Sequence, residues 1–252
     1  MNAKTAPELK LMEDTCRLAA LTLEHTGRFV RAGITTNELD QIALDFILSH
    51  GAISSCVGYH GYPKAICTSV NHVICHGVPD ETVLADGDMI NLDVTVYKHG
   101  FHGDTSATFF VGEVSEQVKK LTACAKDAMM AGIAAVRAGA TTGDVGFAVG
   151  ELVAKRGFFA VREIGGHGIG REFHEDPFVP SHGRKRRGTP LIRGATITVE
   201  PMVNETPAPI YERKIPNSEI TVIETSDGRL SAQFEHTILV TDTGARILTL
   251  LD

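Results

Sequence analysis

The 252-residue sequence contains no apolar stretch that approaches the roughly 20 residues of a membrane-spanning helix. Its first residues also lack the apolar segment of a signal peptide. Positive charge is in short supply: 24 lysines and arginines stand against 31 aspartates and glutamates, giving a net charge of −7. Broad nucleic-acid affinity is therefore disfavoured, because phosphate binding needs a positive field. These absences predict a soluble, cytoplasmic protein that contacts no membrane.

Several common motifs are missing as well. The five cysteines form no CxxC pair and cannot all join in disulfides, so we expect free thiols and no structural zinc site. No HExxH motif for a single zinc ion is present. The glycine-rich segment Gly165–Gly170 fits the spacing of neither a dinucleotide-binding nor a phosphate-binding loop. Its glycines instead predict close backbone approach and unusual torsions around His167.

Four amphipathic helices are predicted, in two pairs. A capping-box pattern of Thr5 and Glu8 precedes the first helix, and the second and fourth helices stop at Gly51 and Gly157. The apolar positions recur at helical spacing over residues 9–23, 39–47, 118–133 and 145–153.

The two helix pairs also share sequence. The segment Arg31–Thr36 (RAGITT) recurs as Arg137–Thr142 (RAGATT), an offset of 106 residues. With one residue of slippage, the strand that ends at Asp93 lies over the strand that ends at Glu200. This similarity predicts an internal duplication within one domain. The predicted single catalytic domain covers residues 1–252, with pseudo-repeats at about 5–111 and 115–241.

Strand signals lie between the helix pairs. Residues 88–97 alternate apolar and polar side chains, residues 104–111 form a second β-rich run, and the glycines between them predict an antiparallel hairpin. Asp93 and Asp104 then lie on opposite arms, directly across from each other for a tight turn and diagonally for a longer loop. Further strands are predicted at 195–200 and 231–241, with an irregular, proline-containing stretch between them.

Acidic residues occupy strand positions where they are disfavoured. A single such carboxylate would normally face solvent. Four of them, Asp93, Asp104, Glu200 and Glu235, together with the glycine-flanked His167, form an oxygen-rich set. Such a set is suited to two divalent ions that share bridging carboxylates.

These residues resemble the type I methionine aminopeptidases, a family of pita-bread metallopeptidases. The resemblance implies an α/β fold of the α+β type, in which an antiparallel sheet with internal pseudo-twofold symmetry is covered by two helix pairs. It also implies removal of the N-terminal methionine from nascent proteins and peptides when the second residue is small. The motifs that carry it are Tyr59–Lys64, Cys75–Pro79, Asn91–Asp93, Gly103–Thr108, Gly166–Gly170, Thr198–Met202 and Ser231–Thr237.

The resemblance assigns metal ligands. Asp93 would bind one divalent ion, and His167 and Glu200 would bind the other. Asp104 and Glu235 would bridge the two ions, whose identity (Co²⁺, Mn²⁺, Fe²⁺ or Zn²⁺) stays open. A monovalent cation is a further expectation, held by the main-chain carbonyls of Asn71, Val73 and Ser231.

It also assigns catalytic and substrate-binding residues. Glu200 would move a proton towards the leaving amine, His76 would contact the scissile amide nitrogen, and His174 would contact the scissile carbonyl. Thiols and aromatic faces suit a thioether, although such a cluster alone would be read as core. The residues expected to bind substrate are Cys56, Tyr59, Tyr62, Cys67, His76, Phe173 and His174.

Two features depart from the family. The chain has no Trp, and Ile220 stands nearest to the place where the family closes its methionine pocket with one. The adjacent basic residues Arg184, Lys185, Arg186 and Arg187 form either a solvated loop or a transient contact with the ribosome, where nascent chains emerge. We expect a monomer. The alternatives are a dipeptidase of the same fold and a non-catalytic binding protein on that fold.

Overall fold

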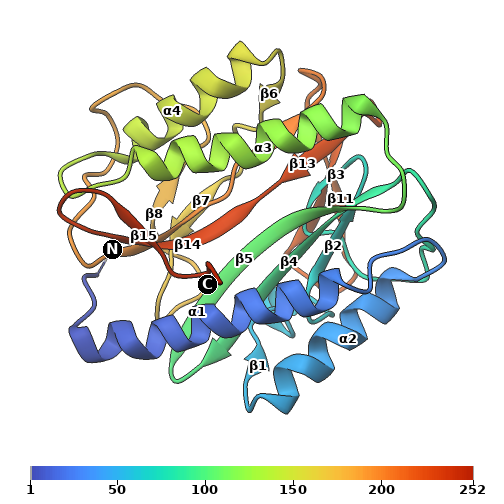
Figure 1. The fold of residues 1–252 in the computed structure, drawn as a ribbon, viewed down its shortest axis with the longest axis horizontal. Coiled ribbons are helices and arrows are strands. Elements are labelled where there is room, and N and C mark those ends of the chain that lie inside the picture. The colour runs from blue at the N-terminus through green and yellow to red at the C-terminus, as the bar shows by residue number, and fades with distance from the viewer. Residues whose placement is uncertain (1, 252) are drawn as a thin grey trace.

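Two helix pairs flank a curled antiparallel sheet in the computed structural model of this chain, which describes residues 2–251 (Figure 1). Met1 and Asp252, the two ends of the predicted domain, lie outside the described residues. The predicted antiparallel sheet with two helix pairs is thus confirmed.

The four predicted helices are present with their expected signals. Thr5 and Glu8 form the predicted capping box, in which the Thr5 N–H donates to Glu8 Oε2 over 2.8 Å. Within residues 2–251, no helix combines the length and the apolar character needed to cross a membrane. The helices are α1 (Ala6–Gly27), α2 (Thr36–Ser49), α3 (Glu116–Ala134) and α4 (Thr142–Lys155), with a short 3₁₀ helix η1 (Tyr59–Gly61).

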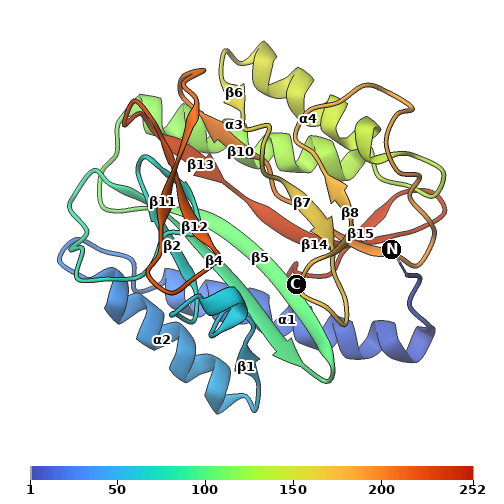
Figure 2. The same cartoon turned by 180° about the vertical axis from the view of Figure 1, so that it is seen from behind.

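The strands form one large and two small sheets. The large sheet has the order β1-β4-β5-β14-β9-β7-β8, with β2 on β4 and β15 on β14, and the small sheets are β13-β10-β6 and β11-β12-β3 (Figures 1 and 2). The strands of the first half are β1 (Ile53–Ser54), β2 (Cys67–Val70), β3 (Val73–Cys75), β4 (Met89–Lys98) and β5 (Phe101–Phe110). Those of the second half are β6 (Phe159–Ala160), β7 (Gly166–Gly168), β8 (Glu175–Val179), β9 (Thr196–Val199), β10 (Met202–Asn204), β11 (Ile210–Lys214), β12 (Thr221–Thr225), β13 (Ser231–Gln233), β14 (Glu235–Val240) and β15 (Ala245–Ile247).

Strand β4 separates the core from the site. Its residues Ile90, Leu92 and Val94 are fully buried in the cluster that α1 and α2 cover. The intervening Asp93 and Thr95 project to the opposite face, because successive side chains of a strand alternate. The sequence alternation therefore places Asp93 on the face away from the helices.

The β4–β5 hairpin has a two-residue turn at His99 and Gly100, both with positive φ. Asp104 pairs with Thr95, whereas Asp93 pairs with Ser106. Asp93 and Asp104 are therefore diagonal neighbours. The turn is tight, but its centre lies one residue later than the one that would place the two carboxylates directly opposite.

The proline-containing stretch between β9 and β13 is not irregular as predicted. It contains β10 and the hairpin β11–β12, whose strands pair from Ile210↔Thr225 to Lys214↔Thr221. Pro209 and Pro216 flank β11, where no ladder hydrogen bond is lost. Most of β11 is exposed and lacks a clear apolar alternation, which hides its strand signal. The predicted strand at 231–241 is also interrupted, at Phe234, between β13 and β14.

The two sequence repeats adopt matching local conformations. Gly33 and Gly139 have φ of 86° and 82°, as a left-handed turn before each second helix of a pair requires. The caps that follow, Thr35 and Thr141, each accept the N3 backbone N–H, and each forms an isolated antiparallel β-bridge, to Val83 and to Pro190 respectively. A common origin for the halves, and their boundaries, stay predictions.

Candidate metal centre and substrate cavity

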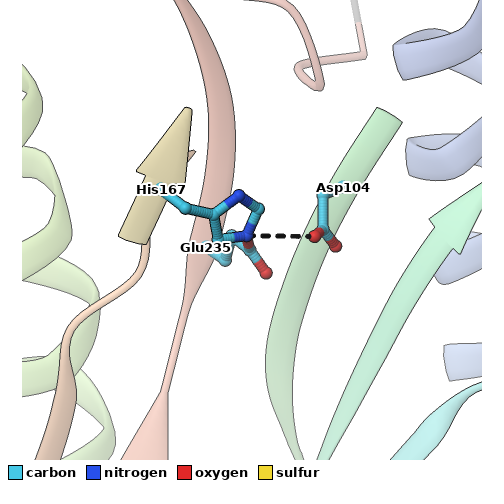
Figure 3. A group of neighbouring side chains, drawn as sticks. All are labelled: Asp104, His167 and Glu235. Atoms are coloured by element: carbon cyan, nitrogen blue, oxygen red, sulfur yellow. Dashed lines mark ion pairs between the residues drawn. The ribbon is translucent and has the colours of Figure 1, made fainter. Parts of the chain in front are cut away.

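Three candidate ligands meet at the centre of the large sheet. Asp104 comes from β5, Glu235 from the first position of β14 and His167 from the middle of β7, and one ligand atom of each lies within 4.8 Å of the others (Figure 3). Asp104 and Glu235 are only 3% and 2% exposed. Residues more than 60 positions apart in the chain thus converge on one point.

The glycines around His167 allow the neighbouring strands to approach β7 closely, as predicted. A Cβ on Gly166 would lie 2.3 Å from the Thr198 carbonyl oxygen, and one on Gly168 would lie 2.3 Å from that of Asp176. The predicted unusual torsions are wrong, because neither glycine has a positive φ. Glycine is needed here for steric reasons, because β7 lies between β8 and β9 and leaves no room for a side chain.

The His167 ring presents a lone pair to carboxylates. Its Nδ1 must donate to the Gly168 carbonyl, 2.9 Å away, because a carbonyl only accepts. Burial lowers the pKa of His167 to about 4, so the ring is neutral near pH 7 and Nε2 carries no proton. Nε2 nevertheless lies 3.6 Å from Glu200 Oε1 and 3.8 Å from Asp104 Oδ2. A lone pair facing carboxylate oxygens favours a cation between them.

Within residues 2–251, the ion-pair contacts of these carboxylates involve only His167, which is neutral near pH 7. Burial raises the pKa of Asp93 to about 7 and that of Glu200 to about 8, and it raises those of Asp104 and Glu235 well above the ordinary value. Glu235 Oε1 is buried without a hydrogen-bond partner among residues 2–251. Buried charges are normally paired or bound to metals. The set of one imidazole and four carboxylates therefore fits divalent cations.

All five candidate ligands line one cavity of about 280 Å³. The same cavity receives every residue expected to bind substrate. Its lining consists of Cys56, Tyr59, Tyr62, Cys67, His76, Asp93, Thr95, Asp104, Glu163, Ile164, Gly165, His167, Phe173, His174, Phe178, Glu200, Ile220 and Glu235.

One end of the cavity is apolar and bears thiols. Cys56, Tyr62 and Cys67 are buried in one cluster, against which Phe173 and Ile220 pack. The Tyr62 hydroxyl donates a hydrogen bond to the carbonyl of Gly77 over 2.9 Å, so it adds no free donor to this end of the cavity. The hydrogen bond with the Cys56 thiol, together with burial, raises the pKa of Cys67 well above the ordinary value, which keeps its thiol protonated. Such a lining suits an unbranched thioether side chain.

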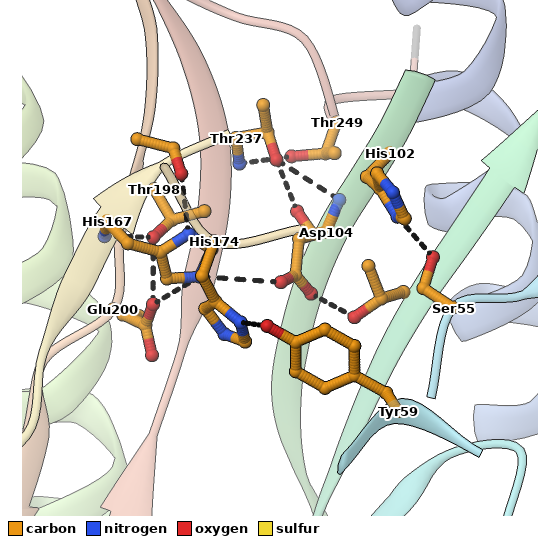
Figure 4. Close-up of polar contacts among 12 residues, drawn as sticks. Ser55, Tyr59, His102, Asp104, His167, His174, Thr198, Glu200, Thr237 and Thr249 are labelled. Atoms are coloured by element: carbon orange, nitrogen blue, oxygen red, sulfur yellow. Dashed lines mark hydrogen bonds and ion pairs between the residues drawn. The ribbon is translucent and has the colours of Figure 1, made fainter. Parts of the chain in front are cut away.

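Two histidines flank the candidate ligands with defined ring orientations. His76 Nδ1 donates to the Thr221 carbonyl over 3.2 Å, which leaves Nε2 as an acceptor. His174 Nδ1 is hydrogen-bonded to the Tyr59 hydroxyl at 2.7 Å (Figure 4). The His174 ring also stacks on Phe173, with centroids 4.3 Å apart and planes at 12°. Both rings are therefore held before any substrate arrives.

The residues expected at a monovalent cation lie together, apart from the cavity. The Ser231 N–H donates to the Asn71 carbonyl over 2.9 Å, and Val73 begins β3, which packs against β13. Asn71 has a φ of 52°, and the Ser231 hydroxyl is buried without a partner among the described residues. Asn71 and Ser231 thus meet through their backbones.

The basic loop is exposed but anchored. Arg184, Lys185, Arg186 and Arg187 all face solvent, while the Arg186 N–H donates to Asp144 Oδ1 over 2.9 Å. The Lys185 ammonium lies 4.5 Å from the centre of the adjacent Phe147 ring on α4. The loop therefore presents its charges from a fixed backbone.

Sequence reasoning missed the hydroxyls that contact the candidate ligands. Thr95 Oγ1 donates to Asp104 Oδ1 over 2.8 Å, and Thr198 Oγ1 lies 2.8 Å from Glu200 Oε1. The available signal was strand alternation, since Thr95 lies two positions after Asp93, and Thr198 two before Glu200.

Comparisons with known proteins agree with one another. Residues 10–242 match the model of metallopeptidase family M24. A methionine aminopeptidase of Escherichia coli (strain K12) is 43% identical over 252 residues, covering 99% of this chain and 94% of that protein. One from Rickettsia prowazekii (strain Madrid E) is 45% identical over 234 residues, covering 93% and 89%. The crystal structure of a methionine aminopeptidase from Rickettsia prowazekii superposes with a TM-score of 0.96 at 42% identity, covering 99% of this chain and all of that one.

Proposed function

The chain belongs to metallopeptidase family M24 and has its pita-bread fold, and we propose that it removes the N-terminal methionine from polypeptides. One observation carries this proposal: a buried pocket of thiols and aromatic rings opens directly onto five candidate metal ligands within one cavity. The two relatives described above, 43% and 45% identical over nearly the whole chain, are methionine aminopeptidases.

The candidate ligands would hold two divalent ions. Asp93 would bind one ion, His167 and Glu200 the other, and Asp104 and Glu235 would contact both. The ions would be Co²⁺, Mn²⁺, Fe²⁺ or Zn²⁺, all of which accept imidazole and carboxylate ligands. When bound, divalent ions polarise a carbonyl oxygen and lower the pKa of water, the two effects that amide hydrolysis needs.

The chain's own residues would orient the amide and move the proton. His76 Nε2, left as an acceptor by the bond from Nδ1 to Thr221, is suited to the N–H of the scissile amide. His174 Nε2 would donate to the scissile carbonyl oxygen while Nδ1 receives the Tyr59 hydroxyl. Glu200 would carry the proton released by the attacking water to the leaving amino group.

Substrate selection would follow from the two ends of the cavity. The buried end formed by Cys56, Tyr62, Cys67 and Phe173 would enclose the methionine side chain, with Tyr59 at its edge. We expect the enzyme to accept only substrates whose second residue has a small side chain, because the segments that carry the two histidines flank the scissile bond.

The wider setting is also proposed. Nascent chains in the cytoplasm would be the natural substrates, and the anchored basic loop Arg184–Arg187 would contact ribosomal RNA transiently by charge. The protein would act as a monomer. A monovalent cation would bind the main-chain carbonyls of Asn71, Val73 and Ser231.

Peptide hydrolysis by metal-stripped protein tests the function. Mn²⁺, Fe²⁺, Co²⁺ or Zn²⁺ is added back separately, and Met-Ala-Ser competes with an Xaa-Pro dipeptide. We expect at least one metal to restore release of methionine from Met-Ala-Ser, with the dipeptide untouched. Preference for the dipeptide would identify a dipeptidase. Metal binding without hydrolysis of either peptide would indicate a non-catalytic binding protein.

A further inference from the structure

Thr198 connects two of the candidate ligands. It is fully buried on β9, and its hydroxyl oxygen receives the backbone N–H of His167 over 2.9 Å (Figure 4). The same oxygen lies 2.8 Å from Glu200 Oε1. One side chain thus touches the backbone of one candidate ligand and the carboxylate of another.

The direction of both hydrogen bonds is determined by chemistry. A backbone N–H only donates, so the Thr198 oxygen accepts from His167. When Glu200 is ionised, as it would be with a bound cation, its carboxylate only accepts, so the single hydroxyl proton points to Glu200 Oε1. Neither bond can be made by a methyl group.

The surroundings leave Thr198 little freedom. Gly166 lets β7 approach so closely that a Cβ there would lie 2.3 Å from the Thr198 carbonyl oxygen. The other oxygen of Glu200 accepts from Gln233 Nε2 over 3.3 Å. Glu200 is therefore held at both oxygens, and Thr198 stands where the segments that carry His167 and Glu200 meet.

We propose that Thr198 is a positioning residue that sets the affinity of the ion site containing His167 and Glu200. This inference rests on the proposed dinuclear function. The ion assigned to Asp93 would contact neither His167 nor Glu200, the two residues to which the Thr198 hydroxyl is hydrogen-bonded. Loss of the Thr198 hydroxyl should therefore weaken one ion site and spare the other.

The variant Thr198→Val keeps the size and branching of the side chain but removes both hydrogen bonds. Loss of a residue that orients metal ligands typically weakens metal binding by about 10–100-fold. The variant Thr198→Ser retains the hydroxyl and should bind metal within about threefold of the unsubstituted protein.

Strand β9 supplies a matched control. Thr196 lies on the same face, is 1% exposed, and donates its hydroxyl to the Ile169 carbonyl over 2.5 Å. The variant Thr196→Val removes a buried hydroxyl bond of the same strand without touching a candidate ligand. It reports what a general loosening of β9 does to metal binding.

Calorimetric titration of the metal-free full-length proteins with Co²⁺ measures the effect directly, without reference to activity. His167→Ala first identifies the binding event that depends on this site. We expect Thr198→Val to weaken that event by about 10–100-fold and to leave the other unchanged, with Thr196→Val and Thr198→Ser close to the unsubstituted protein.

Two results would overturn the inference alone: unchanged Co²⁺ binding in Thr198→Val, or equal weakening in Thr198→Val and Thr196→Val. If the unsubstituted protein shows no Co²⁺-binding event at all, the proposed function is overturned, and the inference with it.

Discussion

Replacing Glu235 by glutamine should lower the activity of the metal-bound protein but raise the thermal stability of the metal-free protein. The substitution keeps the size of the side chain but removes one negative charge from a buried group of four carboxylates. An amide nitrogen does not bind metal as a carboxylate oxygen does, so a residue that contacts both ions would lose its role entirely. Turnover of Met-Ala-Ser should fall by several powers of ten.

The effect on the metal-free protein follows from charge repulsion. Ligand atoms of Glu235 and Asp104 lie within 4.8 Å of each other. At an effective dielectric constant of about 20, two unit charges at this separation repel by about 3.5 kcal/mol. Partial protonation lowers the real value, because burial raises the pKa of both carboxyls well above normal. A relief of about 1–2 kcal/mol should raise the melting temperature of a chain of this length by about 2–8 °C.

Thermal unfolding with and without Mn²⁺, together with peptide hydrolysis, checks both effects. Metal-free Glu235→Gln should melt above metal-free parent protein, whereas added metal should stabilise the parent more. Glu224→Gln is the matched control: this strand residue pairs with Arg213 at 2.8 Å and lies outside the cavity lining. It should keep activity and respond to metal as the parent does. More than about a tenth of parental turnover in Glu235→Gln would refute the bridging role.

Three further substitutions separate chemistry from binding. His174→Ala should lower kcat by about 10²–10³ with little change in KM, as loss of an oxyanion donor does, and an effect on KM alone would reassign this residue to substrate binding. Tyr59→Phe keeps the ring at the pocket edge but removes the 2.7 Å bond to His174; kcat should fall while the preference for methionine over leucine stays, and a changed preference with unchanged kcat would contradict this. Ile220→Trp should narrow selectivity in a series of Xaa-Ala-Ser peptides, since Ile220 lies in the cavity wall; identical profiles would show that it does not limit the first residue.

Local signals in the sequence were sufficient for the helices and the central hairpin. The capping pair Thr5 and Glu8 and the alternation along β4 act within a few residues, so the chain shows them directly. The sequence does not determine the register of the hairpin, because the register depends on whether His99 adopts a positive φ, which is uncommon for residues other than glycine. One residue of turn position decides between opposite and diagonal carboxylates.

Non-local features could not be predicted in the same way. Thr198 reads as an ordinary strand threonine, and its role depends on His167, which lies 31 residues earlier in the chain. Strand β11 is mostly exposed and carries little apolar alternation, whereas its partner β12 is largely buried. The sequence therefore predicts which residues are candidate ligands, whereas it does not predict the contacts between strands that lie far apart in the chain.

The central claim is that the protein removes an N-terminal methionine, and no other first residue, from polypeptides whose second residue is small. Mass spectrometry of polypeptides that differ only in their first two residues tests it most directly, using protein loaded with the metal that restores hydrolysis. The account predicts that a chain beginning Met-Ala loses a single methionine, while chains beginning Met-Leu or Leu-Ala stay intact. Release of leucine from Leu-Ala at a comparable rate, or no release from Met-Ala, would contradict it.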